Sequence, residues 1–161
     1  MKTETEVLSD LAKYCSQAER CIYDVRKKLN ATNLTEDAKN RVINRLIQEK
    51  FIDEQRFCRG FINDKLKFNH WGCIKIIYEL KRRQIKPEIY ADVMDTIDED
   101  EYLSVLSHIL KSKKRSIKGY SDQDIFRKLY SFASSRGFET PLIMKALKDL
   151  FSNIDHEASF E

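Results

Sequence analysis

Basic residues gather in three short runs, and binding of phosphate groups is the chemistry that such runs could perform. The runs comprise Arg26, Lys27 and Lys28, then Lys81, Arg82 and Arg83, and finally Lys113, Lys114 and Arg115. Cations near a helix C-terminus are also favoured by the helix dipole, so a single run has an ordinary structural explanation. Three runs at similar places along the chain favour a surface that binds phosphates or an acidic protein surface.

The segment between Lys65 and Pro87 carries further signals of the same kind. Its single acid is Glu79, and Lys75 precedes the second basic run on the same predicted helix. Trp71, the only tryptophan, stands beside Gly72 just before that helix. The indole has two interpretations: a lid on a helical bundle, or a partly exposed ring that stacks on a base or fills a partner's pocket. Gly72 is typical of a tight turn or a close approach between helices.

Metal binding and catalysis find no support in the residue spacing. The four cysteines (Cys15, Cys21, Cys58 and Cys73) form no C-x-x-C pair, and the three histidines are scattered. We expect the cysteines to be reduced packing residues of a cytoplasmic protein. The acidic cluster at 92–101 lacks the spacing of a calcium loop and is better explained as a helix cap and a solvated face. Phosphate-loop, dinucleotide and hydrolase motifs are absent, so we expect neither an enzyme nor a cofactor.

The composition indicates the elements that must position these residues. The chain has 161 residues, of which 42% are hydrophobic and 34% charged, with four Gly and two Pro. So few helix breakers argue against a β-sandwich, a barrel or a glycine-rich nucleotide fold. The net charge of +3 permits a nucleic-acid partner without requiring one. No apolar run is long enough to span a membrane.

Helical periodicity appears nine times, which predicts an all-α fold. The apolar stripes are Val7–Cys15, Ala18–Leu29, Ala38–Ile47, Phe57–Leu66, Cys73–Leu80, Ile89–Ile97, Leu103–Leu110, Ile125–Ala133 and Ile143–Leu150. Residues that cap helix N-termini precede several stripes: Thr3, Ser16, Thr35, Asp53, Asp98 and Ser121. In the fourth stripe we expect Phe57 and Phe61 in the core and Arg56 paired with an acid.

The stripes repeat along the chain. Ile22, Val25 and Leu29 align with Cys73, Ile76 and Leu80 at an offset of 51 residues, and Ile125 and Leu129 follow Ile76 and Leu80 at 49. We therefore expect one domain of three tandem, helix-turn-helix-like repeats at about 5–52, 53–98 and 99–151, with a frayed tail at 152–161. Each repeat is too small to be stable alone, so neighbouring repeats must pack into an elongated array.

Three stretches of the chain, and a weaker fourth, share the sequence pattern of a known protein family. The first joins Lys13–Glu19 to Val25–Leu29. The second, Leu46–Phe61, has the family's hydrophobic pair before an Asp, then Arg-Phe and a later Phe. The third, Gly72–Ile85, has the family's Gly, basic residue, Ile and Glu-Leu, and Ser135–Phe138 matches a weaker Arg-Gly-Phe turn. Together these stretches resemble the RecX family of bacterial recombination regulators. The chain departs from that family at Lys50 and Gln84, where glycine is common, and at Cys73, where proline or a basic residue is common.

The resemblance implies a function as well as a fold. It implies three tandem three-helix repeats that bind in the groove of the RecA–single-stranded DNA filament and limit its ATP hydrolysis, extension and strand exchange. It carries a binding role to six residues: Arg26, Lys27, Lys28, Lys75, Lys81 and Arg82. Lys113, Lys114 and Arg115 rest on charge alone. The partners are then the RecA filament and, weakly, bare single-stranded DNA. We expect a monomer with no membrane contact.

Two other functions fit the same residues. Three-helix units are compatible with a helix-turn-helix regulator that reads duplex DNA without RecA. They are also compatible with a helical scaffold that binds no nucleic acid. Sequence preference and salt dependence of DNA binding would separate the first alternative from phosphate binding, and charge reversal of the basic runs would test the second.

Overall fold

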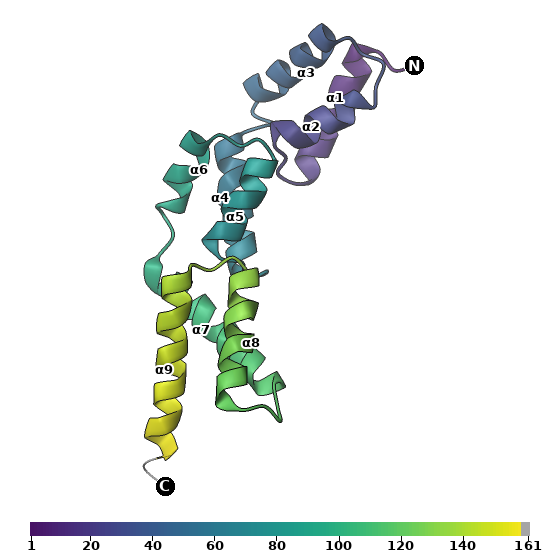
Figure 1. Cartoon of the computed structure of the whole chain (residues 1–161). Coiled ribbons are helices and arrows are strands. Elements are labelled where there is room, and N and C mark those ends of the chain that lie inside the picture. Colours follow the sequence, from purple (N-terminus) through teal and green to yellow (C-terminus); the bar gives the residue numbers. More distant parts are fainter. Residues whose placement is uncertain (159–161) are drawn as a thin grey trace. The chain divides into compact units, whose positions relative to one another are not determined.

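The computed structural model describes residues 1–158, with side chains described for 1–152, and all of its regular secondary structure in this range is helical (Figure 1). In chain order the helices are α1 Glu4–Gln17, α2 Ile22–Asn30, α3 Glu36–Gln48, α4 Glu54–Lys67, α5 Cys73–Arg82, α6 Pro87–Met94, α7 Glu99–Ser116, α8 Asp122–Ser135 and α9 Thr140–Ala158. The predicted all-α fold is confirmed, and the helices follow one another in the order of the apolar stripes.

Side chains close the N-termini of five helices, as the capping patterns predict. The Thr3 hydroxyl accepts a hydrogen bond from the Glu6 amide at 3.2 Å before α1, and Thr35 accepts one from Ala38 at 3.1 Å before α3. The later caps accept backbone N–H groups in the same way: Asp53, Asp98 and Ser121. The first amides of a helix have no partner within it, so each such cap contributes about 1 kcal/mol.

The predicted start of the second helix is wrong. Ser16 does not cap α2, because it still lies in α1 and its hydroxyl donates to the Ala12 carbonyl at 2.8 Å. The N-cap of α2 is Cys21, whose amide donates to the Asp24 carboxylate at 3.3 Å. Ala18, which we expected in the core, lies exposed in the link between the two helices.

The chain divides into two compact units, and the boundary between them falls within α4 and α5. The first unit contains Met1–Phe61 and Glu79–Val93. In it α1, α2 and α3 surround one core (Figure 1), which consists of Val7, Leu11, Cys15, Val25, Leu29, Val42, Ile43, Leu46 and Ile52. Ile47, expected in this core, is 41% exposed, although Ile43, one turn earlier, is buried.

The second unit contains Ile62–Tyr78 and the chain from Met94 onward. Here α7, α8 and α9 pack against one another (Figure 1), and their innermost side chains are Leu106, Leu110, Leu129, Ile143 and Leu147. Helix α9 continues to Ala158, further than the helix end expected near residue 151. The last part of the expected frayed tail, 159–161, lies outside the described residues.

The cysteines are packing residues, as predicted, with one partial exception. Cys15, Cys21 and Cys58 are buried and Cys73 is half-buried, and none of the four forms a disulfide. Burial raises the pKa of Cys21 to about 12 and that of Cys58 to about 11, so these thiols stay neutral and unreactive at neutral pH.

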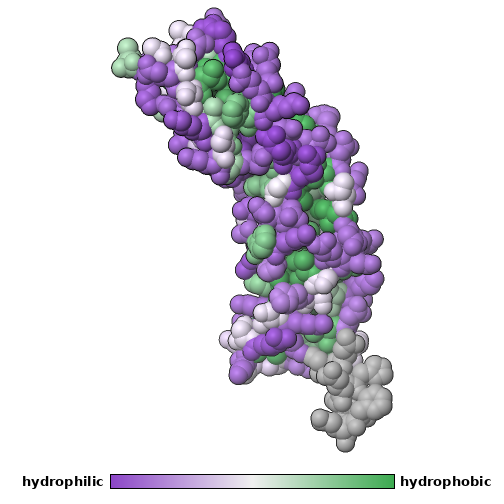
Figure 2. All heavy atoms as spheres, turned by 180° about the vertical axis from the view of Figure 1, so that it is seen from behind, coloured by the Kyte–Doolittle hydropathy of each residue, from purple (hydrophilic) through white to green (hydrophobic). Residues whose placement is uncertain are grey.

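The outer surface is largely polar. Figure 2 shows hydrophilic side chains over most of the face that it displays, with hydrophobic side chains in patches between them. Among the described residues, no helix has the length and hydropathy needed to cross a membrane.

Candidate functional site

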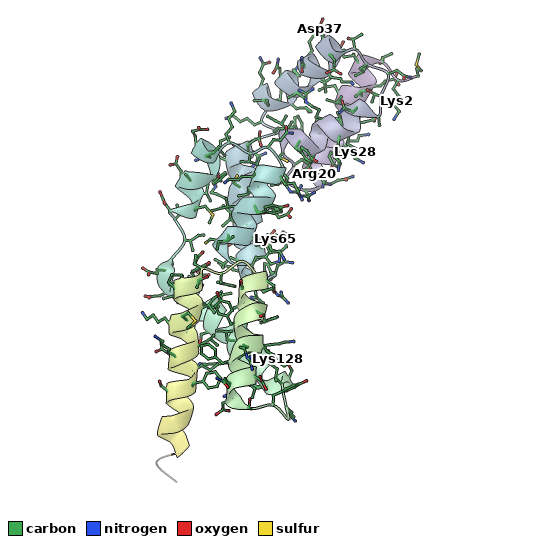
Figure 3. The ribbon with its side chains drawn as sticks, viewed as in Figure 1. Lys2, Arg20, Lys28, Asp37, Lys65 and Lys128 are labelled. Atoms are coloured by element: carbon green, nitrogen blue, oxygen red, sulfur yellow. The ribbon has the colours of Figure 1, made fainter. Side chains whose placement is uncertain are left out.

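Trp71 lies between two lysines in the turn from α4 to α5 of the second unit. The Lys65 Nζ atom is 4.9 Å and the Lys75 Nζ atom 4.5 Å from the centroid of the indole ring. Lys65 is labelled on α4 in Figure 3. The indole is half-buried, and both cations lie where the face of an aromatic ring attracts them.

The backbone of the turn from α8 to α9 holds the Trp71 turn in place. The amide of Gly72 donates to the Arg136 carbonyl at 2.7 Å, and the amide of Ile74 donates to the Gly137 carbonyl at 3.0 Å. A Cβ atom on Gly137 would lie 2.3 Å from the Cβ atom of Lys75, which leaves no room for a side chain. The interpretation of Gly72 as a site of close approach is therefore confirmed.

Tyr102 of α7 anchors the first turn of α5. Its buried hydroxyl accepts a hydrogen bond from the Cys73 amide at 2.9 Å and donates one to the Glu139 carboxylate at 2.8 Å. Burial raises the pKa of Tyr102, so the phenol keeps the proton that it donates. The sequence stripe placed Leu103, rather than Tyr102, in the core. Two groups of contacts thus fix the start of α5, the helix that carries Lys75.

The first basic run lies on α2 in the first unit. The Arg26 guanidinium donates to the Asn40 side chain at 3.0 Å and lies 3.8 Å from Glu36, so α3 partly engages it. Lys27 and Lys28 are exposed. The Lys28 ammonium is 5.1 Å from the centroid of the Tyr14 ring, and the Arg20 guanidinium is 3.9 Å from the same centroid. Figure 3 labels Arg20 and Lys28.

The second basic run, at the end of α5, contains residues in two different environments. Lys81 and Arg82 are exposed, and Arg82 pairs with Glu79 at 3.1 Å. Arg83 forms an ion pair with Asp24 of α2 at 3.0 Å, and its side chain is only 28% exposed. The structure therefore gives Arg83 a partner within the first unit, whereas Lys81 and Arg82 face solvent.

A groove of about 760 Å³ in the first unit brings members of the first two runs together. Arg26, Lys27 and Arg83 line it beside the apolar side chains of Ile22 and Ile52. We call it the α2 groove.

Glu54 also lines the α2 groove, where its Oε2 atom is buried without a hydrogen-bond partner. Burial, and then the neighbouring Asp24, raises the pKa of Glu54 to about 7, against an opposing effect of Lys86. The groove thus holds an acid that titrates near neutral pH among several cations.

The third basic run lies on the last turns of α7 in the second unit. The Lys113 ammonium is 5.3 Å from the Phe132 ring centroid, the Lys114 ammonium is 5.2 Å from that of Phe151, and Arg115 is exposed. Lys113 also lines a groove at the turn between α7 and α8, together with Tyr120 and cations of α8. Sequence reasoning missed Tyr120, although its position beside Gly119 and just after the third run was an available signal.

Comparisons with known proteins agree with this architecture. Residues 53–94 match a family model described as the second three-helix domain of RecX, and residues 99–147 match the model of its third three-helix domain. The two matches together span more than half of the chain.

Three curated relatives of this chain carry the name regulatory protein RecX. The chain is 31% identical over 129 residues to the regulatory protein RecX of Clostridium botulinum, an alignment that covers 78% of this chain and 59% of the relative. It is 33% identical over 124 residues to that of Clostridium tetani, covering 76% and 55%, respectively. A relative from Lactobacillus johnsonii is 23% identical over 141 residues, covering 88% and 52%. The chain thus spans between half and three fifths of the length of these relatives.

Solved structures support the same fold. The crystal structure of RecX from Lactobacillus salivarius superposes with a TM-score of 0.81 at 17% identity, covering 91% of this chain and 96% of that one. A second crystal structure, of regulatory protein RecX, superposes with a TM-score of 0.83 at 16% identity, covering 91% of this chain and 73% of that one.

Proposed function

The chain belongs to the RecX family, and on that premise we propose that it is a regulatory protein that binds a RecA–single-stranded DNA filament and restrains its ATP hydrolysis, extension and strand exchange. The family match is the observation that carries this proposal. The name of its relatives, regulatory protein, also favours a role in binding rather than in catalysis.

The exposed cations supply a physical reason for such binding. A nucleoprotein filament presents a regular row of phosphates, and each cation that contacts a phosphate releases counterions and adds affinity that depends on salt. Lys27, Lys28, Lys81 and Arg82 are exposed on the first unit, and Lys113 and Arg115 on the second. We propose that these six residues, with Lys75 and Trp71, contact the filament, each from its own unit. Arg26, Arg83 and Lys114 are less exposed than the other members of their runs and would contribute less.

The test is a titration of the protein into the host RecA assembled on single-stranded DNA, with ATP hydrolysis as the readout. We expect hydrolysis to fall at less than one molecule per RecA protomer. Unchanged hydrolysis together with an absence of filament binding would reject the proposal. Unchanged hydrolysis with tight, sequence-dependent duplex binding would instead support a helix-turn-helix regulator.

A pair of variants makes the test specific to the basic surface. The double substitution Lys81→Ala with Arg82→Ala removes two exposed charges of the second run and should weaken suppression of hydrolysis. The matched control removes two exposed lysines of α9 that belong to no basic run, Lys145 and Lys148. Equal losses in the two double variants would indicate a general effect of net charge and would remove the second run from the proposed surface.

A further inference from the structure

The turn between α7 and α8 forms a groove that the basic runs alone do not explain. The groove has a volume of about 700 Å³ and lies wholly within the second unit. Its charged and aromatic lining consists of Lys113, Lys118, Tyr120, Arg127, Lys128 and Phe132. We call it the α7–α8 groove.

The lining has a strong excess of positive charge. It includes four cations and, among the described residues, no carboxylate. The nearest acid with a contact to a lining cation is Asp124, which accepts a hydrogen bond from Arg127 and also takes part in the Ser121 cap of α8. Four cations around one concavity create a positive potential that attracts an anionic ligand.

An exposed aromatic ring lies among these cations. Tyr120 is 53% exposed, and the Lys128 ammonium lies 4.3 Å from the centroid of its ring. Figure 3 labels Lys128 on α8. Gly119, at φ +81°, gives the turn just before Tyr120 a backbone conformation that other residues rarely adopt. The turn therefore presents a large ring to solvent where burial would ordinarily be favoured.

We propose that the α7–α8 groove binds a nucleotide unit of single-stranded nucleic acid, with the base stacked on Tyr120 and the phosphate held by the surrounding lysines and Arg127. Proteins that bind single strands combine a cationic groove with aromatic rings on which unpaired bases stack. A duplex keeps its base faces covered by neighbouring base pairs, and an acidic peptide would use the cations but not the exposed ring. The inference adds to the proposed function a contact site for the single-stranded DNA of the filament. It rests on the proposed function only in taking that DNA as the single strand that is bound.

The experiment measures binding of a fluorescent oligo(dT) to the whole chain without RecA, by anisotropy at several salt concentrations. Tyr120→Ala should weaken binding by about fivefold or more, the lower end of what one stacked base contributes, whereas Tyr120→Phe should bind like the wild type. Lys128→Gln should weaken binding and reduce its salt dependence. The matched controls are Tyr78→Ala, which removes a tyrosine that is 65% exposed on α5, and Lys148→Gln on α9; both should bind like the wild type.

Three outcomes would overturn the inference. The first is equal affinity of Tyr120→Ala and the wild type for oligo(dT) in variants whose thermal unfolding is unchanged. The second is an equal loss in Tyr120→Phe, since that substitution keeps the stacking ring. The third is competition by polyglutamate that depends on Lys128 but not on Tyr120, which would assign the groove to an acidic protein segment.

The filament assay separates this inference from the proposed function. A wild-type protein that suppresses hydrolysis by RecA but binds no oligo(dT) would refute the groove and leave the regulatory role in place. A protein that binds oligo(dT) through Tyr120 but neither binds the filament nor changes its ATP hydrolysis would refute the regulatory role and support the groove.

Discussion

A Cβ atom on Gly72 would lie 2.4 Å from the carbonyl carbon of Gly137, so two turns of the second unit meet backbone to backbone. The first turn carries Trp71 and leads into α5, and the second joins α8 to α9. Because hydrogen bonds from Gly72 and Ile74 cross this contact, the position of Trp71 and Lys75 depends on two glycines that are 65 positions apart in the sequence.

We therefore expect both glycines to resist substitution. Gly72→Ala and Gly137→Ala should each lower the free energy of unfolding by about 2 kcal/mol or more, because the added methyl group meets backbone atoms that cannot move aside locally. Gly137 also has φ +93°, which an alanine adopts only with strain. Chemical denaturation monitored by circular dichroism measures the change.

Gly60 provides the control for this prediction. It lies within α4, and a Cβ atom there would have no atom within 4 Å apart from the neighbouring backbone of its own helix. Gly60→Ala should stabilise the protein by about 0.5–1 kcal/mol, because alanine is the better helix former. Denaturation midpoints of the Gly72 and Gly137 variants at or above that of the wild type would contradict the close contact.

At Lys50 and Gln84, in contrast, we expect substitution by glycine to stabilise the protein. Lys50 lies two residues after the end of α3, and Gln84 lies two residues after the end of α5. Their φ angles, 63° and 59°, are in the left-handed region. The amides two residues past each helix cap close the turn: Phe51 donates to Leu46 at 2.9 Å, and Ile85 donates to Leu80 at 3.1 Å. Because glycine adopts this conformation without strain, Lys50→Gly and Gln84→Gly should each stabilise by about 0.5–1 kcal/mol.

The same denaturation assay tests the two substitutions. Gln48→Gly, two residues before Lys50 at the last position of α3, should instead destabilise, since a helical backbone favours a side chain there. A loss of stability in both Lys50→Gly and Gln84→Gly would mean that their side chains contribute more than their backbone strain costs.

Local chemistry explains which parts of the fold the sequence could predict. Thr3, Thr35, Asp53, Asp98 and Ser121 cap helices because their side chains reach an amide two or three residues away, a relationship that is visible in the sequence. The apolar stripes work for the same reason. Cys21 was missed as a cap because a thiol is a poor hydrogen-bond acceptor. At this N-terminus the Asp24 carboxylate forms the capping hydrogen bond by accepting from the Cys21 amide.

Contacts between distant segments lay beyond sequence reasoning. In the sequence Arg83 is indistinguishable from the other cations of its basic run, yet it forms an ion pair with Asp24, which is 59 positions away. Arg56 was expected to pair with an acid, and Glu19, its partner at 2.6 Å, is 37 positions away. Only the packed helices bring these pairs together. The binding role of the basic runs and of Trp71 stays a prediction.

Stability measurements should separate Arg83 from its neighbours in the second basic run. Arg83→Ala should destabilise by about 1–3 kcal/mol, because it leaves the half-buried Asp24 carboxylate without its cation. Lys81→Ala, at an exposed position two residues earlier, should change stability by less than about 0.5 kcal/mol. Equal stability of the two variants would place Arg83 back among the solvent-facing cations.

Glu54, which lines the α2 groove, makes the free energy of unfolding depend on pH. Its folded-state pKa is raised from 4.5 to about 7, mainly by burial and then by Asp24. Between these two values the folded state binds a proton that the unfolded state has already lost, so folding loses stability as the pH rises through this range. The loss saturates above the folded-state pKa, and its size is up to about 3 kcal/mol at 1.36 kcal/mol per pKa unit.

Glu54→Gln tests this relationship because it removes the titrating proton but keeps the shape of the side chain. Denaturation midpoints measured between pH 5 and pH 8 should fall more steeply with pH in the wild type than in the variant, and the variant should be the more stable protein at pH 8. Glu88→Gln, on the exposed side of α6, is the matched control and should keep the wild-type slope. If the wild-type dependence of stability on pH persists in Glu54→Gln, a group other than Glu54 must titrate in this range. The Glu54 carboxylate would then be charged at neutral pH although its Oε2 atom is buried without a hydrogen-bond partner, and the neighbouring Lys86 would have to offset the cost of that charge.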